Sequence, residues 1–212
     1  DLVSCFERWQ TLTMQVLPFL GLHLKDRPSG RLGRAGEAGR RQFLRDMEDT
    51  VDLLYNCVCL GLWVPFNEGW GQFDALAVTD RLRALDPTRP IDHASGWHDQ
   101  GGGDLKSRHV YYRPVRLRGE FGGYSLQCPG HLASDKKFGY RMYDHAAAWM
   151  DAVERLYETE VLPLIESQGL SAAVYTQLSD VEDEVNGLVT YDRRLCKMDP
   201  ARMRKINSKL HF

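Results

Sequence analysis

The sequence predicts an α/β protein built on a parallel sheet, and two patterns carry this prediction. Short apolar runs of strand length alternate along the chain with amphipathic segments of helical length. Each apolar run ends in a polar loop, so functional side chains are expected at the carboxyl ends of the strands. About five strands are predicted, fewer than the eight of a closed (β/α)8 barrel, and the 212 residues lie near the lower size limit of that fold, about 200 residues.

The helices are predicted from apolar residues that recur every three or four positions. This spacing is found over 42–55, 73–85 and 140–162. The DPTRP segment from Asp86 to Pro90 ends the second helix, and Asp199 followed by Pro200 is suited to begin a last one.

Strands are predicted where short apolar runs lie between loops rich in glycine and aspartate. These runs are 59–64, 91–94, 107–112, 115–121 and 171–177. Before them, residues 1–24 are predicted as a helix followed by a strand, and residues 25–41 as a loop rich in glycine and arginine.

Composition excludes several classes of partner. The net charge of -2 provides no basic field to attract nucleic acid or anionic membranes. The longest apolar stretch, Cys57 to Phe66, is about half of the ~20 residues that cross a bilayer. The five cysteines are odd in number and form no Cys-x-x-Cys pair, which argues against a disulfide framework and against a zinc site. Neither nucleic acid nor a membrane is therefore expected as a partner.

Two glutamates stand out because each follows an apolar run in a segment rich in glycine and aromatic residues. Glu68 lies in WVPFNEGWGQ and Glu120 in RLRGEFGG. A carboxyl group partly desolvated beside aromatic rings keeps its proton to higher pH, as a general acid requires. Two carboxylates from different strand ends of one parallel sheet can meet at one substrate atom, which is the arrangement of glycoside hydrolysis. Trp70 can stack on the apolar face of a sugar ring. The alternative is that each glutamate is merely solvated or salt-bridged.

Between these glutamates, His109 and Tyr111 share one face of the predicted strand 107–112. A tyrosine hydroxyl there can orient a carboxylate nucleophile, whereas His109 can equally be a core histidine. A second cluster could be interpreted as a metal site: Asp92, His93, His98, Asp99 and Asp104. It lacks a tight ligand spacing such as His-Glu-x-x-His, so no metal site is predicted.

Five motifs follow one another along the chain: FNEGWGQ, DPTRP, SGW, GEFGG and the later block YTQLSDVEDEVNGLVTYDR, which begins at Tyr175. In this order they resemble the motifs of glycoside hydrolase family 2, the group of β-galactosidases and β-glucuronidases. The resemblance spans about residues 42–210.

The resemblance implies roles for individual residues. Glu68 would be the general acid/base and Glu120 the nucleophile of a retaining double displacement. Asn67 would hydrogen-bond the sugar 2-hydroxyl, and Tyr111 would contact the nucleophile. Further substrate contacts are implied for Trp70, His109, Gln177 and Glu184. In the later block, the polar residues Gln177, Asp180, Glu182, Glu184 and Asn186 either bind sugar hydroxyls or pair with Arg193 and Arg194 in a structural network.

The family's fold implies that residues 1–212 are a single catalytic domain, the C-terminal part of a (β/α)8 TIM barrel that lacks its first strands. The β-sandwich domains of the family would precede residue 1. The implied activity is that of a retaining, β-galactosidase-like glycosidase acting on oligosaccharides or other β-glycosides without a cofactor or metal. The alternative is a non-catalytic carbohydrate-binding remnant with an incomplete barrel. An open barrel edge also predicts self-association into a homo-oligomer. The sequence does not identify the compartment.

Overall fold

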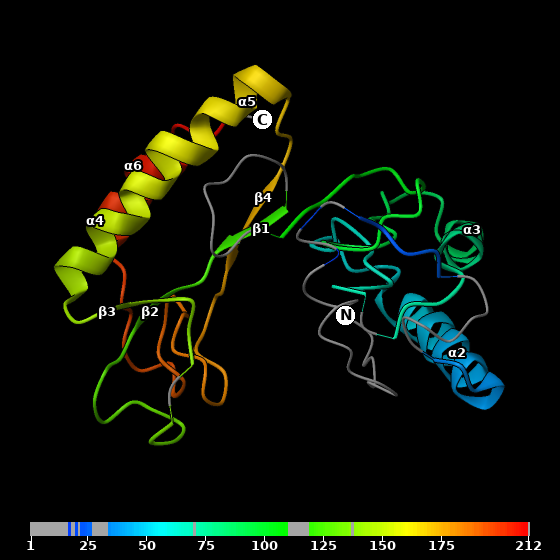
Figure 1. Ribbon diagram of the computed structural model, residues 1–212, viewed down its shortest axis with the longest axis horizontal. Helices are drawn as coiled ribbons and strands as arrows, with labels where there is room; N and C mark the ends of the chain where they lie inside the picture. Colours follow the sequence, from blue (N-terminus) through cyan, green and yellow to red (C-terminus); the bar gives the residue numbers. More distant parts are fainter. Residues whose placement is uncertain are drawn as a thin grey trace. The chain divides into compact units, whose positions relative to one another are not determined.

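The computed structural model divides the chain into two compact units, Asp1–His109 and Val110–Phe212 (Figure 1). The residues that the structure describes are 17, 20, 22–26, 34–69, 71–109, 119–136 and 138–211. Each unit has its own hydrophobic core. Whether the two units make up one catalytic domain stays a prediction.

The first unit contains two helices, α2 (Glu37–Leu54) and α3 (Ala75–Leu85). In both helices, residues about one turn apart point into the core, which confirms the helices predicted over 42–55 and 73–85. Helix α2 begins inside the loop predicted over 25–41, of which residues 27–33 lie outside the described part. The Asp26 carboxylate accepts a hydrogen bond from the Ala75 N–H at 3.0 Å, so a distant residue supplies the negative charge that a helix N-terminus favours.

Aromatic rings organise the core of the first unit. Phe43 of α2 stacks on Phe66 with ring centroids 5.0 Å apart, and Phe73 meets both rings edge-on. Offset stacked and edge-to-face pairs are the favourable arrangements of aromatic rings. The core therefore holds Phe66, the first residue of the FNEGWGQ motif, and Phe73, the residue that follows the motif.

Two extended segments of the first unit pair in parallel. The Trp63 N–H donates to the Pro90 carbonyl at 3.0 Å, and the Asp92 N–H donates to the Trp63 carbonyl at 2.9 Å. Further along, the Ser95 N–H donates to the Phe66 carbonyl at 2.8 Å, and the Glu68 N–H to the Ser95 carbonyl at 2.8 Å. The pairing is parallel, but it amounts to isolated bridges at Trp63 and Asn67 and not to a regular strand.

The DPTRP segment fixes this pairing from one end. The fully buried Asp86 carboxylate accepts hydrogen bonds from the Trp63 indole N–H at 2.8 Å and the Arg89 guanidinium at 2.6 Å. Arg89 in turn donates to carbonyls of the turn that follows α2, at Tyr55, Cys57 and Leu60. One buried carboxylate therefore joins the end of α3 to the extended segment and, through Arg89, to the end of α2.

The second unit contains two parallel strand pairs and a long helical run. Strand β1 (Gly119–Gly122) pairs with β4 (Ala173–Thr176), and β2 (Tyr124–Leu126) with β3 (Arg141–Tyr143). The run consists of α4 (Ala146–Leu156), a π-helical segment (Tyr157–Val161) and α5 (Leu162–Gln168). Helix α6 (Pro200–Asn207) begins at Asp199, whose carboxylate accepts from the Ala201 and Arg202 N–H groups, as predicted (Figure 1).

A buried ion pair lies in the loops of the second unit. Both side chains, Lys197 and Asp180, are almost fully buried, with 2.7 Å between Lys197 Nζ and Asp180 Oδ1. The ammonium group also donates to the carbonyls of Leu126 at 2.8 Å and Val185 at 3.0 Å, which uses all three of its donors. Asp180 accepts from the Gly187 N–H as well. The pair thus joins strand β2 to the segment after β4.

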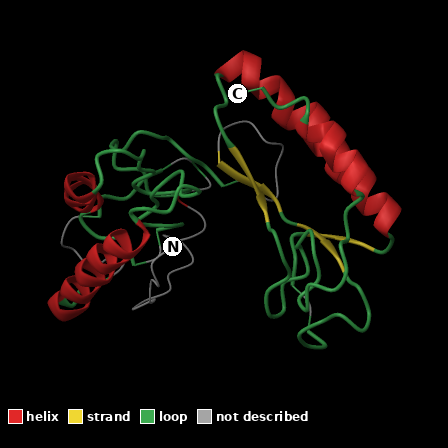
Figure 2. Ribbon diagram, turned by 180° about the vertical axis from the view of Figure 1, so that it is seen from behind, coloured by secondary structure: helices red, strands yellow, loops and turns green. Residues whose placement is uncertain are grey.

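The prediction of a (β/α)8 TIM barrel, whole or partial, is wrong. Regular strands in the described residues amount to two separate parallel pairs, and most of the remaining chain outside the helices is irregular (Figure 2). The segments predicted as strands over 59–64 and 91–94 form only isolated bridges. Their apolar runs end at Pro65 and in a glycine-rich loop after only a few residues, so they are too short to build the continuous ladder of a closed barrel.

Other elements agree with the sequence in part. Strand β4 falls within the predicted 171–177, and β1 lies at the end of the predicted 115–121, of which 115–118 lie outside the described residues. The helix predicted over 140–162 starts later, because Arg141–Tyr143 form β3. Among the described helices, none has the length and apolar character needed to cross a bilayer.

Removal of the Asp86 carboxylate should unfold the first unit more easily. Burial by itself raises the pKa of this carboxyl group, but hydrogen bonds from Thr88, Trp63 and Arg89 outweigh it and hold the pKa well below its usual range. We expect Asp86→Asn to lower the free energy of unfolding by about 3 kcal/mol or more, because Arg89 loses its buried partner. Urea titration followed by tryptophan fluorescence measures this loss.

The Asp86 contribution should also depend on pH in one direction. A carboxyl group whose pKa is lower when folded stabilises the fold above its unfolded pKa, about 3.9, and loses this effect as the pH falls further. The difference between wild type and Asp86→Asn should therefore shrink below about pH 4. Asp80→Asn, at an exposed position of α3, is the matched control and should change little at any pH.

In the second unit, Lys197→Met should be strongly destabilising. The substitution keeps the length of the side chain but leaves Asp180 buried without its cation, which costs about 3–5 kcal/mol in other proteins. Lys205→Met, at an exposed position of α6, makes the same chemical change and should be nearly neutral. Similar urea midpoints for the two variants would show that the buried pair is not stabilising.

Candidate functional site

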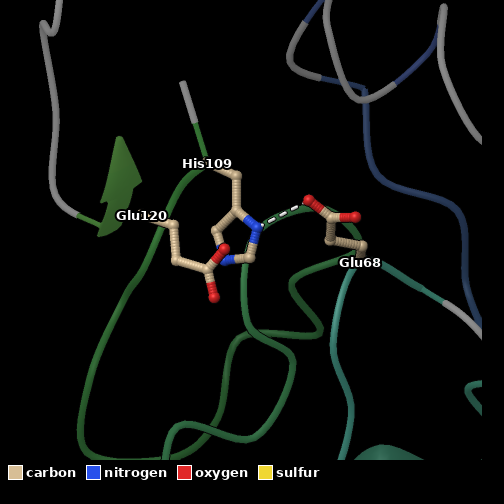
Figure 3. A group of neighbouring side chains, drawn as sticks. All are labelled: Glu68, His109 and Glu120. Atoms are coloured by element: carbon tan, nitrogen blue, oxygen red, sulfur yellow. Dashed lines mark hydrogen bonds and ion pairs between the residues drawn. The ribbon is translucent and has the colours of Figure 1, made fainter. Parts of the chain in front are cut away.

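The first unit brings together two of the predicted site residues, Glu68 and His109. Glu68 ends the first extended segment with a positive φ of 54°, and its side chain is 16% exposed. Its Oε1 lies 2.8 Å from Nδ1 of His109, whose side chain is fully buried (Figure 3). The carboxyl group and the imidazole are thus within direct proton-transfer distance.

The other ring nitrogen of His109 contacts a serine that the sequence analysis did not single out. Nε2 lies 2.9 Å from Oγ of Ser95, and Oγ of Ser107 lies 3.3 Å from the same hydroxyl. The Gly96 N–H donates to Ser107 Oγ at 3.1 Å. His109 is therefore placed between a carboxyl group and a pair of hydroxyl groups.

Asp92 lies at the far end of this group of side chains. It is 4% exposed, and burial raises the pKa of its carboxyl group, although hydrogen bonds from the Ser107 and Ser95 hydroxyls partly offset that effect. Its Oδ1 has no hydrogen-bond partner among the described residues. A connected series of polar side chains in the first unit therefore extends from Glu68 through His109 and the two serines to Asp92.

A carboxylate, an imidazole and a serine hydroxyl in this order also form the catalytic triad of serine hydrolases. Ser95 is 7% exposed, and the N–H group that follows it, that of Gly96, already donates to Ser107. An oxyanion hole needs such N–H groups to be directed at the substrate. The described geometry therefore does not favour Ser95 as a nucleophile.

Asn67 lies beside Glu68 and pairs through its backbone with Ser95. Its buried Oδ1 has no hydrogen-bond partner among the described residues, so it is an acceptor that a ligand hydroxyl could satisfy. Trp70 and Tyr111, both predicted to contact substrate, lie outside the described residues.

The residues of the alternative metal site make other contacts. His93 is buried, its Nε2 accepts from the Gln100 N–H at 3.0 Å, and burial lowers its pKa. Nδ1 of His98 accepts from the Leu24 N–H at 3.3 Å. Asp104 accepts from the Arg83 guanidinium and from the Ile91 N–H, each at 2.8 Å. Within either unit alone, no three described His, Cys, Asp or Glu side chains come close enough to share an ion.

Glu120, the predicted nucleophile, belongs to the second unit. It lies in β1 opposite Val174 of β4, and its Oε2 accepts from the Thr176 hydroxyl at 3.4 Å. The parallel register therefore brings the start of the later block next to the glutamate of GEFGG.

The polar residues of the later block form two groups. Gln177 donates to the Glu184 carboxylate and to the Asn186 amide oxygen, each at 2.7 Å, and Asn186 also donates to Glu184 at 3.3 Å. Asp180 belongs instead to the buried ion pair with Lys197. In the described contacts Arg193 donates to a carbonyl and Arg194 is close to Asp192, so the network proposed between the acidic residues and these arginines is not seen.

Sequence reasoning missed Ser95, Ser107 and Lys197. Ser95 lies in the SGW motif, which was noted only as part of the resemblance, and its role depends on the approach of His109 from another segment. Ser107 begins the strand predicted over 107–112, in which only His109 and Tyr111 were singled out. Lys197 follows the later block and carries no local signal of burial.

Comparison with known proteins adds no assignment, because neither a protein-family model nor a curated protein sequence matches the chain.

Gly96 should be essential for the position of His109. Its φ is +93°, and a Cβ there would lie 2.8 Å from Cγ of the His109 ring. We expect Gly96→Ala to displace the imidazole and to cost about 1–3 kcal/mol beyond the backbone strain, as overpacking does. NMR shifts of the His109 ring and thermal unfolding measure the two effects.

Gly101→Ala is the control that introduces backbone strain without a steric contact of the added Cβ. Its φ of +82° is as unfavourable for alanine, but a Cβ there would meet nothing within 4 Å. This variant should leave the His109 resonances unchanged, and equal shifts in both variants would contradict the role given to Gly96.

Proposed function

We propose that the chain is a retaining glycoside hydrolase that cleaves terminal β-glycosidic bonds, with β-galactosides as the expected class. The contact between Glu68 and His109 carries this proposal. A general acid/base must exist in both a protonated and an ionised form during each cycle. A neutral imidazole can donate a hydrogen bond to the ionised carboxylate or accept one from the protonated carboxyl group. A permanently charged arginine would favour only the ionised carboxylate.

The proposed reaction has two steps. In the first, a Glu120 carboxylate oxygen attacks the anomeric carbon while Glu68 gives its proton to the glycosidic oxygen, so the aglycone leaves and a glycosyl ester forms on Glu120. In the second, Glu68 takes a proton from a water molecule whose oxygen attacks the anomeric carbon. The ester bond breaks, and the sugar leaves with retained configuration.

Other polar side chains would contact the sugar or the nucleophile. Oδ1 of Asn67, which has no hydrogen-bond partner within the described part of the chain, is suited to accept from a hydroxyl next to the anomeric carbon. The Thr176 hydroxyl donates to Glu120 and would help to orient the nucleophile. Gln177 and Glu184 hold each other in place and offer further donors and acceptors to sugar hydroxyls.

A covalent adduct tests this proposal directly. A 2-deoxy-2-fluoro β-galactoside with an activated leaving group forms a glycosyl-enzyme that hydrolyses slowly, because the fluorine destabilises the oxocarbenium-like transition state. Mass spectrometry of the full chain should show one added fluorosugar, carried by the peptide that contains Glu120. Glu120→Gln should abolish the adduct, and Glu68→Gln should lower kcat on phenyl galactoside about 10²–10⁴-fold.

Each outcome has a defined meaning. Glu166→Gln, an exposed substitution of the same kind in α5, is the control and should form the adduct like the wild type. Binding of galactosides without an adduct would instead support a non-catalytic carbohydrate-binding protein. An adduct that persists in Glu120→Gln would disprove the assignment of the nucleophile.

A further inference from the structure

An exposed aromatic ring lies beside the polar residues of the later block in the second unit. The side chain of Phe138 is 48% exposed. Its N–H donates to the Asp183 carbonyl at 2.7 Å, and its carbonyl accepts from the Val185 N–H at 3.1 Å, so Phe138 is the parallel bridge partner of Glu184. Bridge partners lie about 4.8 Å apart and direct their side chains to the same face. The Phe138 ring and the Glu184 carboxyl group are therefore neighbours.

The alternation of side chains shows that this face is the outer one. Val185, the residue after Glu184, is only 2% exposed, so its side chain points to the interior. Successive side chains of an extended segment point to opposite sides, and Glu184 and Phe138 therefore point outward. The Phe138 ring could turn inward only by breaking the two backbone hydrogen bonds that hold it in register. The exposure of this ring is thus fixed by the fold.

The polar side chains next to the ring hold one another in defined orientations. Gln177 Nε2 donates to Glu184 Oε2 and to Asn186 Oδ1, each at 2.7 Å, and Asn186 Nδ2 donates to the same Glu184 oxygen at 3.3 Å. Glu184 and Gln177 are half-buried, and within the described contacts neither of their Oε1 atoms accepts a hydrogen bond. A ligand with hydroxyl donors can satisfy both of these oxygens.

Tyr140 connects this face to the strand that carries Glu120. Its ring meets the Phe138 ring edge-on, with centroids 5.7 Å apart and an angle of 72°. It also covers Gly123, because a Cβ on Gly123 would lie 2.3 Å from Cδ2 of Tyr140. Gly123 directly follows β1, and its N–H donates to the Thr176 carbonyl at 2.9 Å. The aromatic pair is therefore continuous with the carboxyl ends of β1 and β4.

We infer that Phe138, Glu184 and Gln177 form a binding site for one pyranose sugar. The C–H face of the sugar packs on the exposed Phe138 ring, and hydroxyls at its edge donate to the two Oε1 atoms. A pyranose offers both an apolar face and a rim of donors, which matches an aromatic ring beside fixed acceptors. The pyranose class rests on these contacts of the second unit, whereas galactose as the preferred sugar rests on the proposed function.

Binding of free sugars to the full chain tests the site without any hydrolysis. Saturation-transfer NMR with galactose and with glucose should show transfer to the C–H protons of galactose. We expect Phe138→Ala to raise the Kd at least about tenfold, because the sugar loses its apolar contact. Phe138→Trp keeps an aromatic ring and should retain binding. Tyr191→Ala, which removes another exposed aromatic ring of the second unit, is the matched control and should bind like the wild type.

A second pair of variants tests the acceptors. In Glu184→Gln the side-chain oxygen can still accept from Gln177 and Asn186, but an amide N–H then takes the place of the acceptor offered to the ligand. We expect this change to raise the Kd about two- to tenfold, the effect of one hydrogen bond. Glu182→Gln makes the same change at an exposed neighbouring position and should leave the Kd unchanged.

The outcomes for this site and for the proposed function can be told apart. Equal binding by wild type and Phe138→Ala, or binding of neither sugar, would overturn the inference even in an active glycosidase. Binding of glucose alone, weakened in Phe138→Ala, would support the site and disprove galactosides as the substrate class. Sugar bound through Phe138 by a chain that hydrolyses no glycoside would support the site and disprove the proposed function.

Kinetics provide a further readout in a chain that hydrolyses phenyl β-galactoside. A contact made equally in the ground state and the transition state affects KM and not kcat. Phe138→Ala should therefore raise KM about tenfold at an unchanged kcat. A fall in kcat at constant KM would contradict a binding role for Phe138.

Discussion

The parallel register between Trp63–Glu68 and Ile91–Ser95 is the constraint on which the first unit depends. It places the Glu68 N–H on the Ser95 carbonyl, so that the side chains of both residues reach the same imidazole. A slip of one residue would turn every side chain of the segment to the opposite face and would separate Glu68 from His109. The contact of Glu68 and Ser95 with the same imidazole therefore depends on the backbone hydrogen bonds that fix this register.

Buried charged side chains hold distant segments of this chain together, as long hydrogen-bond ladders do in regular sheets. In the first unit, Asp86 joins α3, the indole of Trp63 and, through Arg89, the turn after α2. In the second unit, Lys197 joins Asp180 to two carbonyls. Leaving a buried charge without its partner costs much more free energy than leaving an exposed charge without one. These contacts therefore hold the loops in defined positions. This explains how a chain with little regular strand holds definite side-chain geometry.

The helices could be predicted from the sequence because their signals are local. Apolar residues at helical spacing define α2 and α3, and the Asp199-Pro200 pair marks the start of α6 through hydrogen bonds to the next turn. The arrangement of the strands could not be predicted in the same way, and the predicted barrel is wrong. A strand becomes part of a sheet only through a partner that is distant in sequence, and the apolar run before Pro65 looks the same whether it joins a barrel or a single pair of bridges.

By itself, the sequence determined the helices, the absence of a basic field, and the two motifs that carry Glu68 and Glu120. These depend on composition and on neighbours within a few residues. Only the tertiary structure decided that His109 is the partner of Glu68, that Ser95 holds the other side of its ring, and that Lys197 is the buried cation of the later block. Each of these contacts joins residues brought together by the fold, and no local pattern in a chain encodes the distance between two such side chains.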